Sequence, residues 1–270
     1  MAVYDTLLGY FIRRNIIGKN RIYNFMVRGG LRKLIIVQAK YGIKLYLNPH
    51  EYIDEFIINE GFYESEVTEE ILEVIKEGDC FWDIGANIGI HSIAVKKNLP
   101  NTKVYSFEPN PKTLGLLYEN IKLNNLDIQV CGFALFDKVS SMTLHLADGN
   151  SGMSTLAPWQ EMKVSSTTKC LTVTGDKLIS EGFTLPTLIK IDTEGTELNI
   201  LRGCQSILST PVLKTIIFEG NNNLLEKLDK DETTIFLKDF GFTQIKQLSR
   251  FEKTQHGLSN FVATKPKLNF

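Results

Sequence analysis

Four carboxylate side chains near two strand-like runs are the residues of this chain best suited to proton chemistry. Asp192, Glu194 and Glu197 fall within six residues, and Glu219 ends a later apolar run. Such a group can act as a general base and position an acceptor, bind a divalent cation, or cap the following helix. We favour the first use, with Asp192 and Glu194 as catalytic residues and Glu219 contacting the substrate, and we predict no metal site.

The segment that carries these carboxylates has the pattern of a strand, a turn and a helix. Strand alternation places Lys190 and Asp192 on one face, with Asp192 at the end of the strand. Glu194 follows in the turn, where the N-terminus of a helix stabilises a carboxylate. We therefore expect Asp192 to lie over a cleft.

A second group with chemical meaning is the glycine turn at 83–89, which reads DIGANIG. Glycine lets the backbone turn sharply and approach a ligand closely. The dinucleotide fingerprint G-x-G-x-x-G would need glycine where this chain has Asn87 and Ile90. The turn therefore disfavours NAD and favours a ligand without a pyrophosphate.

Glu108 ends the next strand-like run, 23 positions after Gly85. An acidic residue at this place can accept hydrogen bonds from both ribose hydroxyls of an adenosine. Alternatively, Glu108 merely caps the helix that starts near Pro111. We favour the ribose role because the glycine turn is in register with it.

Two histidines are weaker candidates for a general base. His91 lies in the first turn of the helix after the glycine turn, where it can face the cleft or pack as a structural residue. His145 alternates with Met142 and Leu144 in a later strand-like segment. A lone histidine is more often structural, so only His91 stays in the catalytic set.

Strand and helix patterns alternate from residue 80 onward, which predicts an α/β fold with a parallel sheet wound on both faces. Strands are expected at 80–84, 103–107, 128–134, 187–192 and 214–219, and helices at 88–98, 111–124, 195–208 and 231–240. Runs at 242–248 and 259–264 have no helix between them and predict an antiparallel edge hairpin. Before this region we expect a strand at 41–48 and helices at 51–60 and 64–77, the second capped by Gly78.

The stretch 139–175 interrupts the alternation as an insertion. It holds strand-like runs at 142–146 and 169–173 and a Ser/Thr/Gly-rich segment at 148–155. An insertion that follows a parallel strand lies where loops carry function.

The composition fits a globular protein, with 43% hydrophobic and 23% charged residues and a formal net charge of −1. Residues 1–50 hold nine basic residues and one acidic residue, a balance of +8, so residues 51–270 carry −9. We divide the chain into a basic N-terminal extension at 1–50, with two short helices in 1–35, and a domain at 51–270. A basic arm can contact nucleic acid or an anionic membrane, but a solvated helix pair is the simpler interpretation.

The four cysteines are widely spaced and form no zinc-binding pattern; Cys80 and Cys131 are expected in the core. This cysteine usage weakly indicates a reducing compartment, and no secretory signal or membrane-length apolar run is apparent. We therefore expect a cytoplasmic protein.

The sequences DIGANIGIHS, FEPNP and KIDTEGTELNILRG together resemble the FkbM family of S-adenosylmethionine-dependent methyltransferases. The resemblance covers roughly residues 61–262 and does not extend to residues 1–50. It implies a Rossmann-like class I methyltransferase fold, with a seven-stranded, mostly parallel sheet that ends in an antiparallel hairpin.

The resemblance also implies a role for each matching residue. The methionine part of S-adenosylmethionine would contact Asp83, Gly85, Ala86, Asn87 and Gly89. Glu108 would hold the ribose, Ala134 would lie beside the adenine, and Asp192 would lie near the sulfonium. Ser154, in a Ser/Thr loop similar to one in this family, would contact the acceptor, with Tyr63 and Glu64 closing the cleft from the other side.

The expected function is therefore S-adenosylmethionine-dependent O-methylation of a sugar, glycan, glycolipid or natural product. One alternative is a nucleotide- or NAD-binding oxidoreductase, which the glycine spacing disfavours. Another is a non-catalytic module recruited by the basic arm. No nucleic-acid partner is expected, because the chain has no Asn-Pro-Pro-aromatic motif. The acceptor and the oligomeric state are not defined by the sequence.

Overall fold

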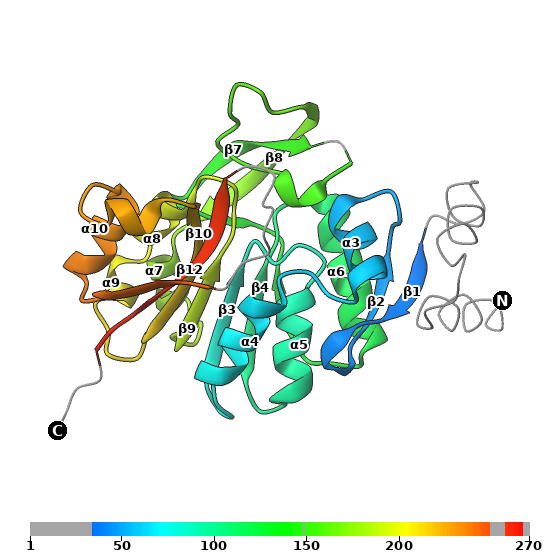
Figure 1. The fold of residues 1–270 in the computed structure, drawn as a ribbon, viewed down its shortest axis with the longest axis horizontal. Coiled ribbons are helices and arrows are strands. Elements are labelled where there is room, and N and C mark those ends of the chain that lie inside the picture. Colours follow the sequence, from blue (N-terminus) through cyan, green and yellow to red (C-terminus); the bar gives the residue numbers. More distant parts are fainter. Residues whose placement is uncertain (1–33, 148, 249–256, 267–270) are drawn as a thin grey trace.

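The computed structural model describes residues 34–147, 149–248 and 257–266, which form an α/β domain around a seven-stranded sheet (Figure 1). In sheet order the strands are β11 (Gln244–Gln247), β12 (Leu258–Thr264), β10 (Thr215–Asn221), β9 (Leu188–Ile191), β3 (Cys80–Ile84), β4 (Lys103–Phe107) and β5 (Gln129–Cys131). Strand β12 is antiparallel to β10 and β11, and the other pairs are parallel. The predicted sheet with its antiparallel edge pair is confirmed.

The two faces of the sheet bury separate hydrophobic cores. In β3, Phe81 packs into one core and Trp82 into the other. Helices α4 (Ser65–Val74), α5 (Ile90–Asn98) and α6 (Pro111–Leu123) cover the first face, and α7 (Gly175–Ser180), α8 (Glu197–Arg202), α9 (Gln205–Leu208) and α10 (Glu232–Asp239) cover the second (Figure 1). Because both faces are buried, β3 reads as a nearly continuous apolar run.

The order of the strands places a topological switch point in the middle of the sheet. From β3 the chain moves outward to β4 and β5, then returns to β9 on the other side of β3 and continues to β10. Ligands of open α/β sheets bind outside the carboxyl ends of the strands at such a point. The ends of β3 and β9 are therefore the expected place for a site.

Residues 35–47 form a β-hairpin and not part of a helical extension. Strands β1 (Ile35–Gln38) and β2 (Lys44–Leu47) pair across the short turn η2 (Lys40–Gly42), and their apolar residues join the core under α5 and α6. Asn120 of α6 anchors the hairpin by accepting a 2.6 Å hydrogen bond from the Tyr46 N–H. The helices predicted within 1–35 lie almost entirely outside the described residues, as does most of the basic arm.

The predicted insertion forms a small sheet of its own beside the carboxyl ends of the large one. Its strands are β6 (Ala134–Leu135), β8 (Val164–Val173) and β7 (Ser140–Ala147), with the turn η3 (Ser151–Met153) between β7 and β8. The single strand predicted at 128–134 is wrong in extent, since β5 ends at Cys131 and Ala134 begins β6. The chain turns at this point because β6 pairs with β8 instead of continuing along β4.

Two helix boundaries also differ from the prediction. The helix predicted at 195–208 is divided into α8 and α9, and at Gly203, between them, a Cβ would lie 2.0 Å from the Phe136 carbonyl oxygen. Helix α4 ends at Val74 with Ile75 already extended, so Gly78 does not cap it. The remaining elements are α3 (Tyr52–Glu60) and η4 (Leu224–Lys227). In the part of the chain that the structure describes, no helix is both long and apolar enough to cross a bilayer.

Candidate active site

A pocket lies at the carboxyl ends of β3, β4, β9 and β10, partly covered by the insertion and by the segment before α4. Its lining residues are Ile53, Tyr63, Glu64, Ile84, Gly85, Asn87, Phe107, Glu108, Pro109, Ala134, Leu135, Leu144, Asn150, Ser151, Gly152, Ser154, Thr155, Leu156, Asp192, Thr193, Glu194, Thr196 and Glu219. The predicted site residues among them are Tyr63, Glu64, Gly85, Asn87, Glu108, Ala134, Ser154, Asp192, Glu194 and Glu219. Those that do not line the pocket are Asp83, Ala86, Gly89 and His91.

The glycine turn is shaped by close approach of two backbones. The N–H groups of Gly85 and Ala86 both donate to the Phe107 carbonyl at 3.0 Å, which holds the turn against β4. Gly85 has a φ of +76°, and a Cβ there would lie 1.9 Å from the Asp192 carbonyl oxygen. Gly89, by contrast, packs against the Leu117 side chain beneath the pocket. Only glycine at position 85 lets the turn meet the end of β9.

We expect Gly85→Ala to destabilise the fold by about 4 kcal/mol, since positive φ and a backbone clash add. Gly78→Ala is the matched control, because Gly78 has a φ of +88° but open space around it. It should cost only about 1 kcal/mol. Urea unfolding of both variants measures the difference. Equal losses of unfolding free energy in Gly85→Ala and Gly78→Ala would show that the contact between the turn and β9 does not constrain residue 85.

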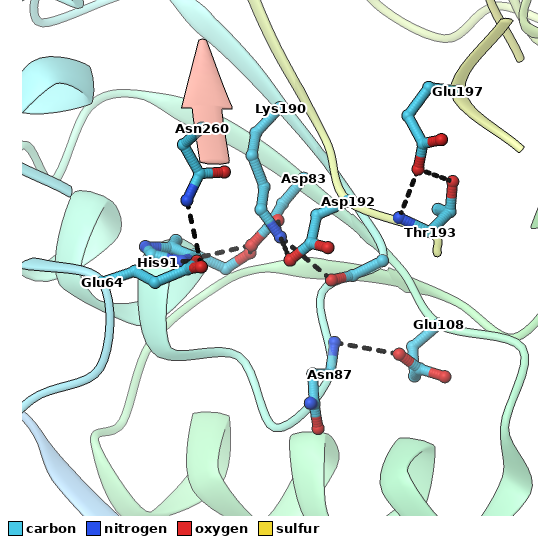
Figure 2. Close-up of polar contacts among 12 residues, drawn as sticks. Glu64, Asp83, Asn87, His91, Glu108, Lys190, Asp192, Thr193, Glu197 and Asn260 are labelled. Atoms are coloured by element: carbon cyan, nitrogen blue, oxygen red, sulfur yellow. Dashed lines mark hydrogen bonds and ion pairs between the residues drawn. The ribbon is translucent and has the colours of Figure 1, made fainter. Parts of the chain in front are cut away.

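Glu108 lies at the end of β4 with both carboxylate oxygens directed at backbone donors. Oε2 accepts from the Asn87 N–H at 2.9 Å and Oε1 from the Asn110 N–H at 2.8 Å (Figure 2 shows the first contact). Burial raises the pKa of Glu108 to about 7. The cap of α6 is Asn110, which accepts from the Lys112 N–H, so the capping alternative for Glu108 is wrong. Each Glu108 oxygen keeps a lone pair for a ligand hydroxyl.

Two predicted residues lie beneath the pocket. Asp83 is fully buried, and its Oδ2 accepts from the Ser92 hydroxyl at 2.6 Å and the Ser92 N–H at 3.2 Å. The Nδ1 of His91 is 2.7 Å from the Thr68 hydroxyl, and its Nε2 is 3.8 Å from Glu64 Oε2. The prediction that His91 faces the cleft is wrong, because this side of α5 packs against α4 and Glu64 stands between His91 and the pocket.

Three carboxylates converge at the other side of the pocket. Asp192, Glu194 and Glu219 each place an oxygen within 4.8 Å of the others. Burial and mutual repulsion raise the pKa of Glu194 to about 8 and that of Glu219 to about 10. Oxygens this close can share a proton or a cation, but acidic groups often cluster without an ion, and we assign no metal ligand here.

Glu197, the first residue of α8, holds the turn that precedes the helix, and the N-cap residue Thr196 forms no side-chain cap in the described structure. Its carboxylate accepts from the Thr193 N–H at 3.0 Å and the Gly195 N–H at 3.1 Å (Figure 2 shows its contacts with Thr193). Glu194 has a φ of +58°, and no backbone donor to its side chain was found among the described residues. The Glu194 side chain therefore lines the pocket and does not cap the helix N-terminus.

The match with a known family covers most of the residues that line this pocket, all except Ile53, Tyr63 and Glu64. Residues 83–243 match the methyltransferase FkbM domain. The chain belongs to the FkbM methyltransferase family. Since the family is one of methyltransferases, the oxidoreductase alternative is not retained.

Individual relatives of this FkbM methyltransferase are distant. It is 30% identical over 194 residues to the hexuronic acid methyltransferase AglP of Haloferax volcanii, covering 70% of this chain and 74% of the relative. It is 25% identical to methyltransferase 1 of Beauveria bassiana, covering 62% and 74%. The crystal structure of methyltransferase FkbM from Methylobacillus flagellatus KT is 15% identical with a TM-score of 0.45; the match covers 78% of this chain and about half, 52%, of that one.

Sequence reasoning missed several residues that complete the pocket of this FkbM methyltransferase. Asn150 and Thr155 line it from the insertion, and the Thr155 hydroxyl donates to the Glu194 carbonyl at 2.9 Å. The Ser/Thr/Gly-rich composition of 148–155 was the signal for this segment, although it did not single out these two side chains. Lys190, noted only for sharing a face with Asp192, is buried directly under the carboxylates.

The raised pKa values predict how the stability of this FkbM methyltransferase depends on pH. Because folding raises the pKa of Glu219 from 4.5 to about 10, the folded chain holds a proton that the unfolded chain releases. The unfolding free energy therefore falls as pH rises through this range. We expect Glu219→Gln to raise the melting temperature at about pH 9 by about 5 °C and to change it little near pH 5.

Thermal unfolding across pH, followed by circular dichroism, measures this effect. Glu161→Gln, which removes one carboxylate from the exposed loop of the insertion, is the control for the change in net charge. Parallel melting curves for the wild type and Glu219→Gln at every pH would contradict the account of the cluster.

Proposed function

We propose that this FkbM methyltransferase transfers a methyl group from S-adenosylmethionine to a hydroxyl of a sugar, glycan, glycolipid or natural product. The observation that carries the proposal is the position of Glu108, a buried carboxylate at the end of β4 that faces the pocket beside the glycine turn. This arrangement suits the ribose of an adenosine. S-adenosylmethionine, when bound, supplies a methyl group on a positively charged sulfur.

The residues around Glu108 fit that cofactor. The Asn87 side chain lines the pocket, and its buried Oδ1 has no hydrogen-bond partner in the described structure, so a ligand donor such as an amino group would satisfy it. Apolar contacts for an adenine are available from Phe107 and Leu135, next to Ala134. We propose that Gly85 and Asn87 lie along the methionine part, while Asp83, Ala86 and Gly89 support the turn from below.

The converging carboxylates suit an acceptor with hydroxyl groups. Methyl transfer to oxygen requires alignment of the acceptor and removal of its proton, and alignment alone can contribute roughly 7–11 kcal/mol. We propose that Asp192 or Glu194 accepts the proton, and that Glu219, Ser154, Tyr63 and Glu64 orient the acceptor. The acceptor oxygen loses its proton as the bond between this oxygen and the methyl carbon forms and the bond between that carbon and sulfur breaks. The relative that methylates a hexuronic acid supports a sugar acceptor.

The test is a transfer assay with S-adenosylmethionine that carries a tritiated methyl group. The acceptors are neutral methyl glycosides, hexuronic acids and glycans or lipids extracted from the source cells. Label in a product whose mass has risen by one methyl group, with the site located on an oxygen by fragmentation, is the expected result. Label on nitrogen or carbon would contradict O-methylation, and no label in any acceptor with no cofactor binding would overturn the whole proposal.

A further inference from the structure

Lys190 is a buried cation that the proposed reaction does not use. Its Nζ lies 3.1 Å from Asp192 Oδ2, 3.2 Å from the Gly85 carbonyl oxygen and 3.6 Å from Asp83 Oδ1 (Figure 2). Its side chain is only 3% exposed. One ammonium group therefore links β3, the glycine turn and the end of β9.

No basic side chain of the described residues lines the pocket next to Lys190. The pocket lining, within the described residues, includes Glu64, Glu108, Asp192, Glu194 and Glu219 but no lysine or arginine. Burial disfavours the charged form of a carboxylate, whereas a cation in hydrogen-bond contact favours it. Asp192 is the lining carboxylate that receives a hydrogen bond from Lys190.

Lys190 contacts the buried Asp83 and, at shorter distances, two groups in the wall of the pocket. Both hydrogen bonds from Ser92 go to Asp83 Oδ2, while the buried Oδ1 has no hydrogen-bond partner among the described residues and lies 3.6 Å from Lys190 Nζ, the longest of the three Lys190 contacts. The two shorter contacts of Lys190 go to Asp192 and Gly85.

Other charged groups act on Asp192 in addition to Lys190. The pKa of Asp192 lies above its ordinary value, because burial and the Glu64 carboxylate raise it more than the Lys190 ammonium lowers it. The titratable groups that surround Asp192 are Tyr63 and Glu64 before α4, Asp83 in β3, His91 in α5, Glu194 in the turn, Glu197 in α8 and Glu219 in β10. Most of them are acidic, so Lys190 is the main contribution that favours the anion of Asp192.

We propose that Lys190 is a positioning residue that opposes protonation of Asp192 and fastens it to the glycine turn, so that Asp192 is the pocket carboxylate that accepts the acceptor's proton. The proposal rests on the proposed function. It explains why one strand carries both side chains on the same face, two residues apart. It also separates Asp192 from Glu194 and Glu219, because among the described residues Lys190 forms its ion pair in the pocket wall with Asp192 and not with either of them.

The test is the titration of Asp192 in the full-length chain, followed by NMR of carbon-labelled aspartate side chains, with the Asp192 signal assigned by its loss in Asp192→Asn. Removal of the cation in Lys190→Met should raise the titration midpoint of Asp192 by about 1–2 pH units. Isothermal titration of S-adenosylhomocysteine provides a second measurement. Its dissociation constant should rise about tenfold, because the Gly85 carbonyl loses its donor.

Asp83→Asn/Lys190→Met is the second variant, since it leaves no unpaired charge at Asp83 if the single variant fails to fold. Asp83→Asn alone removes an anion and should move the Asp192 midpoint in the opposite direction. Lys265→Met is the matched control, because the Lys265 ammonium also donates to two carbonyls, of Leu208 and Thr210, but lies outside the pocket.

A midpoint for Asp192 in the double variant within about 0.3 pH unit of that in Asp83→Asn overturns the proposal, as does a shift in Lys265→Met equal to that in Lys190→Met. Failure of the wild type to bind S-adenosylhomocysteine would count against the proposed function instead, and the titration of Asp192 would still report on Lys190.

Discussion

Replacing Glu108 by alanine should weaken binding of S-adenosylmethionine about 100-fold. Two hydrogen bonds from ribose hydroxyls to a buried carboxylate contribute about 3 kcal/mol together, and each 1.4 kcal/mol changes a dissociation constant tenfold. The variant also releases the Asn87 and Asn110 N–H groups, which loosens the glycine turn. Isothermal titration gives the affinity directly.

Asp176→Ala is the matched control for Glu108. The Asp176 carboxylate, in α7, likewise accepts from two backbone N–H groups, those of Ser206 and Ile207 in α9, but it does not line the pocket. It should lower stability without changing cofactor affinity. Equal losses of affinity in the two variants, or an unchanged affinity in Glu108→Ala, would contradict the assignment of the ribose to Glu108.

Asp192→Asn should lower the rate of methyl transfer about 1,000-fold, within the range that a general base contributes. The amide keeps the shape of the side chain but cannot accept the proton. Glu194→Gln should cost only about tenfold, because the raised pKa of Glu194 already keeps it mostly protonated near neutral pH. Initial rates with the acceptor found in the transfer assay measure both.

Asp231→Asn is a control for these rates, since Asp231 caps α10 and lies outside the pocket. A larger loss for Glu194→Gln than for Asp192→Asn would assign the proton to Glu194. Rates near that of the wild type in both variants would show that neither carboxylate takes the proton.

The elements around the cofactor turn were predictable because their patterns are local. The apolar run of β3 reflects burial on both faces, and two-residue alternation correctly placed Lys190 and Asp192 on one face, as their 3.1 Å contact confirms. Glu108 could be placed at the pocket for the same reason, since the carboxyl ends of adjacent parallel strands meet at one edge.

The remaining features depend on contacts between distant segments. Nothing near His91 reveals that Thr68 and Glu64 surround it, and nothing near Ala134 reveals that it pairs with β8. Asp83 lies in the glycine-turn motif, yet its side chain points to Ser92 and Lys190 beneath the pocket. The strand predicted at 41–48 contains β2, but its partner β1 was missed, because the pairing of the hairpin and its contacts with α6 join separate segments.

Isothermal titration of the wild-type chain with S-adenosylmethionine, S-adenosylhomocysteine and NAD tests the central claim most directly. The account predicts saturable binding of both adenosylated ligands at one site per chain and no heat from NAD, because the glycine turn offers a pyrophosphate the Asn87 side chain where it needs bare backbone. Saturable binding of NAD, with no response to either adenosylated ligand, would contradict it.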